Sequence, residues 1–208
     1  EENRVRHMDY SFQLNKLMYE RLISGGNITL FDPKDVPGLY DAFYADQDKF
    51  KELYEKYERA YSIRKKVLPA LEVFQSLLQE RKDTGRIYIM NVDHANEHGS
   101  FIPELAPIRM SNLCCEIDLP TKPLESYDDP NGEISLCTLS AINWGLINHP
   151  HEFKKYCNLA VRGLDELLDY QDYPIIAAEL STMARRPLGI GIINLAYFLA
   201  KRGLKYDE

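Results

Sequence analysis

The spacing of apolar residues changes twice along the chain, and this order of patterns limits the possible folds more than any other feature. Up to about residue 85 the apolar residues recur at helical spacing, as they do from Met8 to Ser24. From about 86 to 145 they lie in short extended runs, and after Trp144-Gly145 the helical spacing returns. Helices, then strands, then helices do not suggest a compact two-layer domain. We therefore expect a piece of a larger α/β protein.

Six segments are expected to be helical. Asp9 can cap the first and Gly25-Gly26 can end it, and Asp46 opens the second. Pro69 should kink or restart the third, because proline lacks the N–H group that a helix interior needs. The six segments are Met8–Ser24, 47–61, Ser62–Lys82, His151–Tyr170, Pro174–Met183 and Leu188–Ala200.

Four segments between these helices are expected to be extended, and the first is the short piece Ile28–Phe31, which ends at Asp32-Pro33. Arg86–Val92 alternates and is rich in β-branched and aromatic residues, which favours a strand. The segments LCCEIDL at 113–119 and EISLCTL at 133–139 have the same extended character. A loop rich in Pro, Asp and Gly separates them and runs from Pro120 to Gly132.

The charge balance restricts the class of partner. The 208 residues carry a formal net charge of −7, with 45% hydrophobic and 27% charged residues. Diffuse negative charge argues against a general nucleic-acid coat or a binder of anionic membranes. The longest apolar run, Pro187–Ala200, is shorter than the roughly 18 residues that span a bilayer. We therefore expect neither a nucleic acid nor a membrane as a partner.

Metal binding is not favoured by the sequence. Four cysteines are too few for a disulfide scaffold of this size, and no Cys-x-x-Cys pair suggests a zinc site. His94 and His98 are spaced i, i+4, but Gly99 and the preceding strand place them in a loop. The Gly-Ile-Gly of Gly189–Gly191 lacks the full dinucleotide pattern, so close helix packing explains it better. Cys157 lies on an amphipathic helix and is expected to be buried by packing.

The segment SNLCCEI, Ser111–Ile117, holds two thiols, an amide and a carboxylate within seven residues. In an extended segment the side chains alternate between two faces, which would put Asn112, Cys114 and Glu116 on one side. Cys115 would then lie on the apolar side as a small hydrophobe. The alternation therefore selects Cys114 as the reactive candidate.

The chemistry of this face favours hydrogen-atom transfer. An adjacent carboxylate keeps a thiol protonated, and a neutral thiol is a poor nucleophile that can still give or receive a hydrogen atom. Glu116 could take a proton from a substrate hydroxyl, and Asn112 could orient that hydroxyl. The alternative is a half-buried strand with cysteine as filler and Glu116 at the surface, and spacing alone favours it. Cys137, taken alone, is equally explained as a core residue.

Longer segments carry a resemblance to a known family. SNLCCEIDLPTKPL and NGEISLCTLSAIN closely resemble the large, catalytic subunit of class I ribonucleoside-diphosphate reductase, in its aerobic bacterial and phage form. The segments DVPGLYDAFYADQ, TGRIYIMNVDHAN, LLDYQDYP and RRPLGIGIINLAY extend the likeness over nearly the whole chain. Asn-Leu-Cys-x-Glu in this setting is specific.

The resemblance implies an α/β fold that forms part of a ten-stranded α/β barrel, with the radical cysteine on a central finger loop. The alternation of side chains around Cys114 would then be confined to this loop and would not be part of a β-ladder. Residues 1–208 are expected to be a partial catalytic barrel domain and a central fragment of the subunit. Its parts are a helical N-terminal part (about 1–85), a strand and active-loop part (about 86–145) and a helical C-terminal part (about 146–208).

The resemblance also implies catalytic roles. Cys114 matches the cysteine that becomes a thiyl radical and takes the 3′ hydrogen of the substrate, and Glu116 matches the base that takes the 3′-hydroxyl proton. Asn112 matches the amide that hydrogen-bonds the reacting sugar. Cys137 matches one half of the redox-active disulfide, whose partner is absent from the chain. The implied substrate-binding residues are Asn112, Leu113, Glu116 and Leu139.

The implied reaction reduces ribonucleoside diphosphates to 2′-deoxyribonucleoside diphosphates for DNA synthesis. No cofactor or metal is expected in this chain. The radical would come from a small subunit with a di-iron/tyrosyl group, and ATP or dATP effectors would bind elsewhere. Other expected partners are the flanking segments of the same subunit and thioredoxin or glutaredoxin, in the cytoplasm, or the host cytoplasm for a phage protein.

We do not expect this chain to be active alone. One alternative is an inactive structural or assembly piece of a split reductase. Another is a related reductase that generates its radical with cobalamin.

Overall fold

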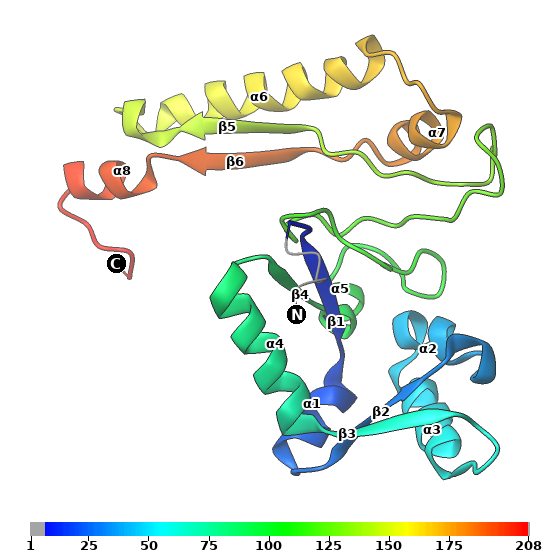
Figure 1. Cartoon of the computed structure of the whole chain (residues 1–208). Helices are drawn as coiled ribbons and strands as arrows, with labels where there is room; N and C mark the ends of the chain where they lie inside the picture. The colour runs from blue at the N-terminus through cyan, green and yellow to red at the C-terminus, as the bar shows by residue number, and fades with distance from the viewer. Residues whose placement is uncertain (1–6, 208) are drawn as a thin grey trace. The chain divides into compact units, whose positions relative to one another are not determined.

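The computed structural model describes residues 7–207 and shows an α/β chain that divides into two compact units, up to Thr121 and from Lys122. Each unit is described separately, and Figure 1 labels their elements. The first six residues of the expected N-terminal part, and residue 208, lie outside the described range. The expectation of one partial barrel domain with three parts stays a prediction.

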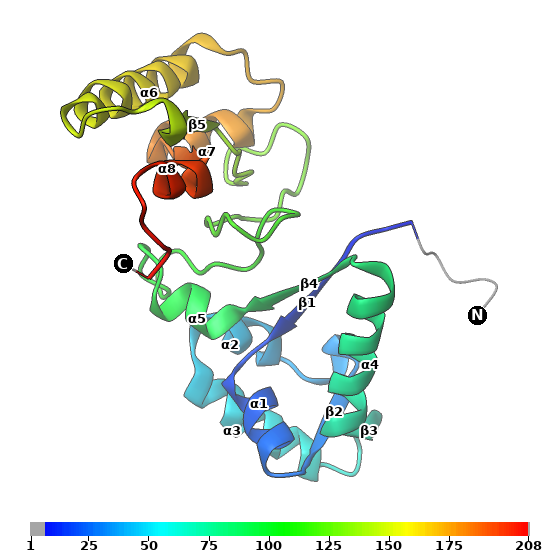
Figure 2. The same ribbon diagram turned by 90° about the vertical axis from the view of Figure 1, so that its left-hand side faces the viewer.

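The first unit contains two strand pairs and five α-helices among its described residues. β1 pairs with β4 in parallel, from Tyr10 opposite Ile87 to Leu14 opposite Asn91, whereas β2 and β3 are antiparallel. Figure 2 shows the β1–β4 pair with α4 beside it. The elements are β1 (Tyr10–Leu14), α1 (Lys16–Ile23), β2 (Asn27–Phe31), the 3₁₀ turn η1 (Pro33–Asp35), α2 (Leu39–Ala45), α3 (Gln47–Arg59), β3 (Lys65–Pro69), α4 (Ala70–Thr84), β4 (Ile87–Asn91) and α5 (Val92–Glu97).

Three buried clusters hold the first unit together. One lies around α2 and α3 and includes Phe50 and Tyr54, and another joins β1, β2 and α4. The third contains Met90, Val92 and Ile108, with Ile108 only 1% exposed. Because Ile108 lies just before Ser111, the core reaches the segment that leads into the candidate site.

Two of the expected helices in this unit are wrong in their first halves. Met8–Ser24 contains β1 before α1, and α1 is capped by Asn15, whose side chain accepts a hydrogen bond from the Met18 N–H. Ser62–Lys82 contains β3, and the predicted restart after Pro69 is confirmed, since α4 begins at Ala70. Both errors arise because a strand depends on a distant partner strand, whereas sequence spacing reports only local order.

Other local predictions are confirmed. Asp46 caps α3 by accepting a hydrogen bond from the Lys49 N–H, as its position before a helical run predicts. Gly85 ends α4 with a φ of 66°, a left-handed conformation that suits glycine. The predicted strand Arg86–Val92 forms β4.

The second unit pairs β5 with β6 in parallel, from Leu139 opposite Gly189 to Asn143 opposite Ile193. α6 runs along β5 in Figure 1 and packs against it. The elements are β5 (Leu139–Asn143), the 3₁₀ turn η2 (Trp144–Leu146), α6 (His151–Tyr170), α7 (Ile176–Arg185), β6 (Gly189–Ile193) and α8 (Leu195–Lys201).

The predictions for this unit are partly confirmed. α6 spans His151–Tyr170 as predicted, but Leu188–Ala200 is wrong as one helix because β6 occupies its first half. Gly189 and Gly191 therefore lie in a strand and not in a helix packing surface. The prediction that Cys157 is buried is also wrong, because its side chain is exposed on α6.

The α/β class is confirmed, but the described residues form three two-stranded sheets and no closed barrel. The ten-stranded barrel and its finger loop stay predictions.

Candidate active site

Residues Ser111–Asp118 form a tight reversal of the chain, which we call the cysteine turn. Its two ends, Ser111 and Asp118, form an antiparallel bridge. The Asn112 N–H donates to the Ile117 carbonyl at 3.3 Å, and the Cys115 N–H donates to the Asn112 carbonyl at 3.1 Å. The second bond closes a β-turn whose corner residues are Leu113 and Cys114.

The side chain of Asn112 organises this turn. Its Oδ1 atom accepts hydrogen bonds from the Glu116 N–H at 3.2 Å and the Ile117 N–H at 3.1 Å. Asparagine favours the first position of a β-turn because its side chain can bond to nearby backbone in this way. Asn112 is therefore a structural member of the site as well as a candidate for contact with substrate.

The two cysteines occupy different environments. Cys114 is exposed at the corner of the turn, next to Leu113, which is 59% exposed. Cys115 is partly buried, has a φ of 61°, and its Sγ accepts a hydrogen bond from the Ser111 Oγ at 3.3 Å. The turn therefore presents the Cys114 sulfur to the outside and uses Cys115 internally.

The predicted extended conformation of 113–119 is wrong. The backbone turns at Leu113 and Cys114 and takes a left-handed conformation at Cys115, so side chains do not alternate through the segment. The alternative of a half-buried strand is wrong for the same reason. The alternative is right that Glu116 is exposed, but Glu116 lies in a turn and not in a strand. The distinction between the two cysteines survives, although it comes from turn geometry and not from strand parity.

Cys137 lies in the second unit, on a segment that connects an anchored loop to β5. The segment 133–138 is not a strand, and regular pairing begins only at Leu139. Within the predicted extended segment 133–139, only Glu133, in an isolated bridge with Lys122, and Leu139, at the start of β5, are paired with another strand. Cys137 is exposed and is not a core residue.

Glu133 anchors this segment at its start. Its carboxylate lies 2.7 Å from the Lys122 Nζ and 2.6 Å from the Arg185 Nη2. Burial alone would raise the pKa of Glu133, but the two cations overcome this effect and the pKa is lowered. The backbone groups of Glu133 and Lys122 also bond to each other in both directions, at 3.1 Å. The loop from Pro120 to Gly132, which the sequence predicted, is thus closed at its base.

Leu139 follows Cys137 at the start of β5 and is 55% exposed. It lies against Gly189 of β6, where a Cβ atom would be only 2.5 Å from the Leu139 Cδ2. Glycine at 189 therefore leaves the space that the Leu139 side chain occupies.

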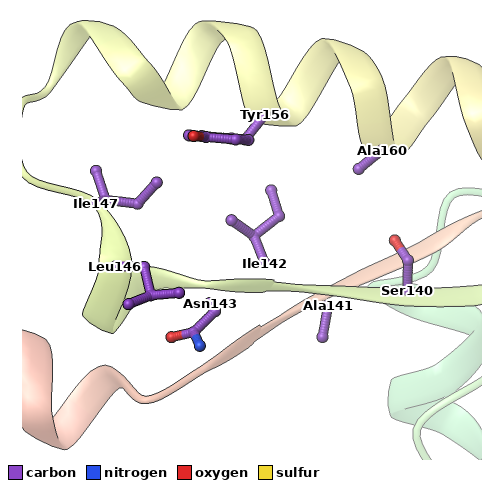
Figure 3. A pocket seen from close by; sticks show the side chains of 8 residues that line it. All are labelled: Ser140, Ala141, Ile142, Asn143, Leu146, Ile147, Tyr156 and Ala160. Atoms are coloured by element: carbon purple, nitrogen blue, oxygen red, sulfur yellow. The ribbon is translucent and has the colours of Figure 1, made fainter.

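A cavity of about 310 Å³ lies between β5, η2 and α6. Figure 3 shows Ile142, Ile147, Tyr156 and Ala160 around this space, with Ser140 on the side that faces α6. The Ser140 Oγ is buried and has no hydrogen-bond partner among the described residues. Sequence analysis did not single out this cavity, because its residues are ordinary members of a strand and a helix.

No metal centre accompanies these features within residues 7–207, because no three His, Cys, Asp or Glu side chains are grouped to hold an ion. His94 lies in α5 and His98 caps its end, so the expected loop is a short helix. Their rings are 5.5 Å apart between centroids. The absence of a metal from the chain stays a prediction.

Comparison with known proteins identifies the family. The sequence profile described as ribonucleotide reductase, barrel domain, matches residues 1–208. The chain belongs to this ribonucleotide reductase family. It is 64% identical over 208 residues to the ribonucleoside-diphosphate reductase subunit alpha of Haemophilus influenzae. The corresponding subunits of Escherichia coli and Enterobacteria phage T4 are 62% and 46% identical over 208 and 214 residues.

All of this chain is covered in each of the three matches, but it spans only 27–28% of the length of these relatives. The resemblance to the large reductase subunit is confirmed. No described helix of this reductase segment is both long and apolar enough to cross a membrane.

The predicted site residues are divided between the two units. In this reductase segment Asn112, Leu113, Cys114 and Glu116 belong to the first unit, whereas Cys137 and Leu139 belong to the second. Their assembly into one substrate site stays a prediction.

Proposed function

We propose that this chain carries the radical and proton-transfer residues of a ribonucleoside-diphosphate reductase. The observation that supports this most is the place of Cys114, exposed at the corner of a hydrogen-bonded turn. A sulfur that exchanges a hydrogen atom with a ribose must reach the substrate while its backbone stays fixed. Membership of the ribonucleotide reductase family over residues 1–208 gives this geometry its chemical meaning.

In the proposed reaction Cys114, as a thiyl radical, takes the 3′ hydrogen atom of the ribose. Glu116 takes the proton of the 3′ hydroxyl, as a general base. Asn112 hydrogen-bonds the sugar. Because the Asn112 Oδ1 already accepts two backbone N–H groups, this contact comes from the amide nitrogen. Leu113 and Leu139 line the substrate pocket with Asn112 and Glu116.

The reduction requires two electrons and two protons in addition to the radical. We assign one of the two thiols that supply them to Cys137, and the other to a cysteine outside this chain. The 2′ hydroxyl leaves as water, the two thiols become a disulfide, and the hydrogen atom held by Cys114 returns to C3′. The Cys114 radical is thereby regenerated. Thioredoxin or glutaredoxin then reduces the disulfide through further cysteines.

The radical itself comes from a partner in this proposal. A small subunit with a di-iron/tyrosyl group would supply it, and ATP or dATP would bind outside residues 1–208. Turnover without added cobalamin, in the presence of that subunit, would support this source. A requirement for cobalamin would instead favour the cobalamin-dependent type.

The test compares the two neighbouring cysteines in a full-length alpha polypeptide that contains this chain. With a radical-generating subunit and a dithiol reductant, Cys114→Ser should abolish reduction of a ribonucleoside diphosphate. Cys115→Ser is the matched control and should retain activity, because that sulfur contacts Ser111 inside the turn. Activity in Cys114→Ser would show that the proposal is wrong.

A second candidate is a structural or assembly piece without a catalytic role. It is favoured by apolar side chains that α6 leaves exposed, including Leu159 at 59% and Tyr170 at 88%. Such surfaces are usual where another polypeptide packs. Full loss of activity in every combination with flanking segments, with normal folding, would support this candidate.

A further inference from the structure

The segment entering the cysteine turn is held by side-chain amides that the sequence analysis did not single out. We call Ile108 and Arg109 the entry stem, since only Met110 separates them from Ser111. Three backbone polar groups of the stem bond to side chains: the Ile108 N–H, the Ile108 carbonyl and the Arg109 carbonyl.

Asn96 provides two of these bonds. Its Oδ1 accepts from the Ile108 N–H at 2.7 Å, and its Nδ2 donates to the Ile108 carbonyl at 3.0 Å. The same Nδ2 donates to the Val92 carbonyl at 2.8 Å. Asn96 is only 6% exposed, so these bonds replace water contacts that it cannot make. The bonds tie the stem to the start of α5, directly after β4.

Gln13 provides the third bond from the neighbouring strand. Its Nε2 donates to the Arg109 carbonyl at 2.7 Å, and its Oε1 accepts from the Tyr44 hydroxyl at 2.7 Å. The Arg109 guanidinium lies 5.4 Å from the centre of the Tyr44 ring and 3.1 Å from an Asp41 oxygen. Gln13 is in β1, and Asn96 is in α5, which directly follows the partner strand β4, so two neighbouring elements hold the stem.

We propose that Asn96 and Gln13 are positioning residues. They fix the position and orientation of the cysteine turn relative to β1 and α5, and therefore the position of the Cys114 sulfur. This inference rests on the proposed function. Hydrogen-atom transfer depends steeply on the distance between donor and acceptor atoms, and a displacement of about 1 Å can lower a rate about 100-fold. A buried amide that bonds both polar groups of one residue suits this task better than apolar packing, which lets the backbone slide.

The experiment uses the full-length alpha polypeptide with its radical-generating subunit. The first variant is Asn96→Ala, which removes both bonds to Ile108 and the bond to Val92. The second is Gln13→Met, which keeps the length of the side chain but removes the bonds to Arg109 and Tyr44. The matched control is Asn15→Ala. Asn15 is also fully buried, but it caps α1 and bonds Gln47, without contact to the stem. Each protein is assayed with ordinary and 3′-deuterated ribonucleoside diphosphate.

For Asn96→Ala and Gln13→Met, kcat should fall about 10- to 100-fold with little change in KM. The deuterium isotope effect on kcat should rise, because breaking the 3′ C–H bond becomes rate-limiting. Asn15→Ala should lower the melting temperature but leave the isotope effect unchanged. If Asn96→Ala does not fold, Gln13→Met decides.

An unchanged isotope effect in Gln13→Met, with kcat lowered only in proportion to the unfolded fraction, would overturn the inference. Failure of the proposed function would look different: Cys114→Ser would then keep its activity, whatever the stem variants do.

Discussion

Asn112 has a structural role in the cysteine turn and a second, proposed role in binding the substrate. Its side-chain oxygen accepts from the N–H groups of Glu116 and Ile117, so the shape of the cysteine turn depends on it. In the proposed function its amide nitrogen has a second role, toward the sugar. The two roles belong to different atoms and can therefore be separated by substitution.

Asn112→Asp should preserve the turn and lose activity, because aspartate keeps the accepting oxygen but has no amide nitrogen. Asn112→Ala should lose both the turn and the activity. The loss of its two hydrogen bonds, one exposed and one part-buried, should lower the free energy of unfolding by about 1 kcal/mol. Thermal unfolding and turnover of the full-length subunit measure the two effects. Full activity in Asn112→Asp would exclude a substrate role for the amide nitrogen.

Glu133 is a second residue whose charge has a structural effect. Burial acts to raise the pKa of Glu133. The neighbouring Lys122 and Arg185 act to lower it, and because their effect is the larger one, the pKa lies below its ordinary value. A lowered pKa in the folded state means that the stabilisation is present above the unfolded-state pKa. It is lost as the pH falls through the lowered pKa of the folded state.

Glu133→Gln should lower the free energy of unfolding at neutral pH by about 1–3 kcal/mol, since Arg185 would lose a charged partner. The difference from the unsubstituted protein should shrink as the pH falls and Glu133 becomes protonated. Thermal unfolding at several pH values measures it. Glu166→Gln, at an exposed position on α6, is the control and should show little effect. A difference independent of pH would contradict the assignment.

At the scale of elements, the pairing of β5 and β6 decides how Leu139 lies. The pair brings Gly189 opposite Leu139 and Gly191 opposite Ala141. A Cβ at position 189 would meet the Leu139 side chain at 2.5 Å, whereas one at position 191 would be in ordinary contact, at 3.8 Å or more. The two glycines therefore have different importance in the same strand.

Gly189→Ala should displace the Leu139 side chain and raise KM for the ribonucleoside diphosphate, because Leu139 lines the proposed pocket. The cost in stability should be small, since the clashing atom is the end of a flexible, half-exposed side chain. Gly191→Ala is the matched control and should leave KM unchanged. Steady-state kinetics of the full-length subunit test the pair, and equal effects at both positions would contradict the argument.

At the scale of the whole molecule, the described residues leave much apolar surface and many strand edges exposed. Leu159, Leu167 and Tyr170 are 59%, 44% and 88% exposed, and their spacing places them on one side of α6. Within residues 7–207 each of the three sheets has two strands, so each strand there has one edge outside the ladder.

The chain alone should therefore self-associate. The double substitution Leu159→Glu and Leu167→Glu should lower the apparent mass in sedimentation velocity. Leu105→Glu, at an exposed leucine outside α6, should not. A monomer at all concentrations before substitution would contradict this expectation.

Some features were predictable because their causes are local. The backbone hydrogen bonds of α6 lie within the helix itself. Its apolar spacing was therefore enough to predict both of its ends, His151 and Tyr170. Asp46, Pro69 and Gly85 act within a few residues of their own position, and their predicted effects are confirmed. The choice of Cys114 over Cys115 also came from the sequence, although through an incorrect strand pattern.

By itself, then, the sequence determined the helices whose backbone hydrogen bonds are internal, the presence of a loop before Cys137 and the reductase family to which the chain belongs. Only the tertiary structure decided that Tyr10–Leu14, Lys65–Pro69 and Gly189–Ile193 are strands, because the partners of a strand lie far away in the chain. It also decided the shape of the cysteine turn and the role of Asn96. The role of a buried amide depends on which backbone groups lie within hydrogen-bond distance of it, and folding, not sequence spacing, decides this.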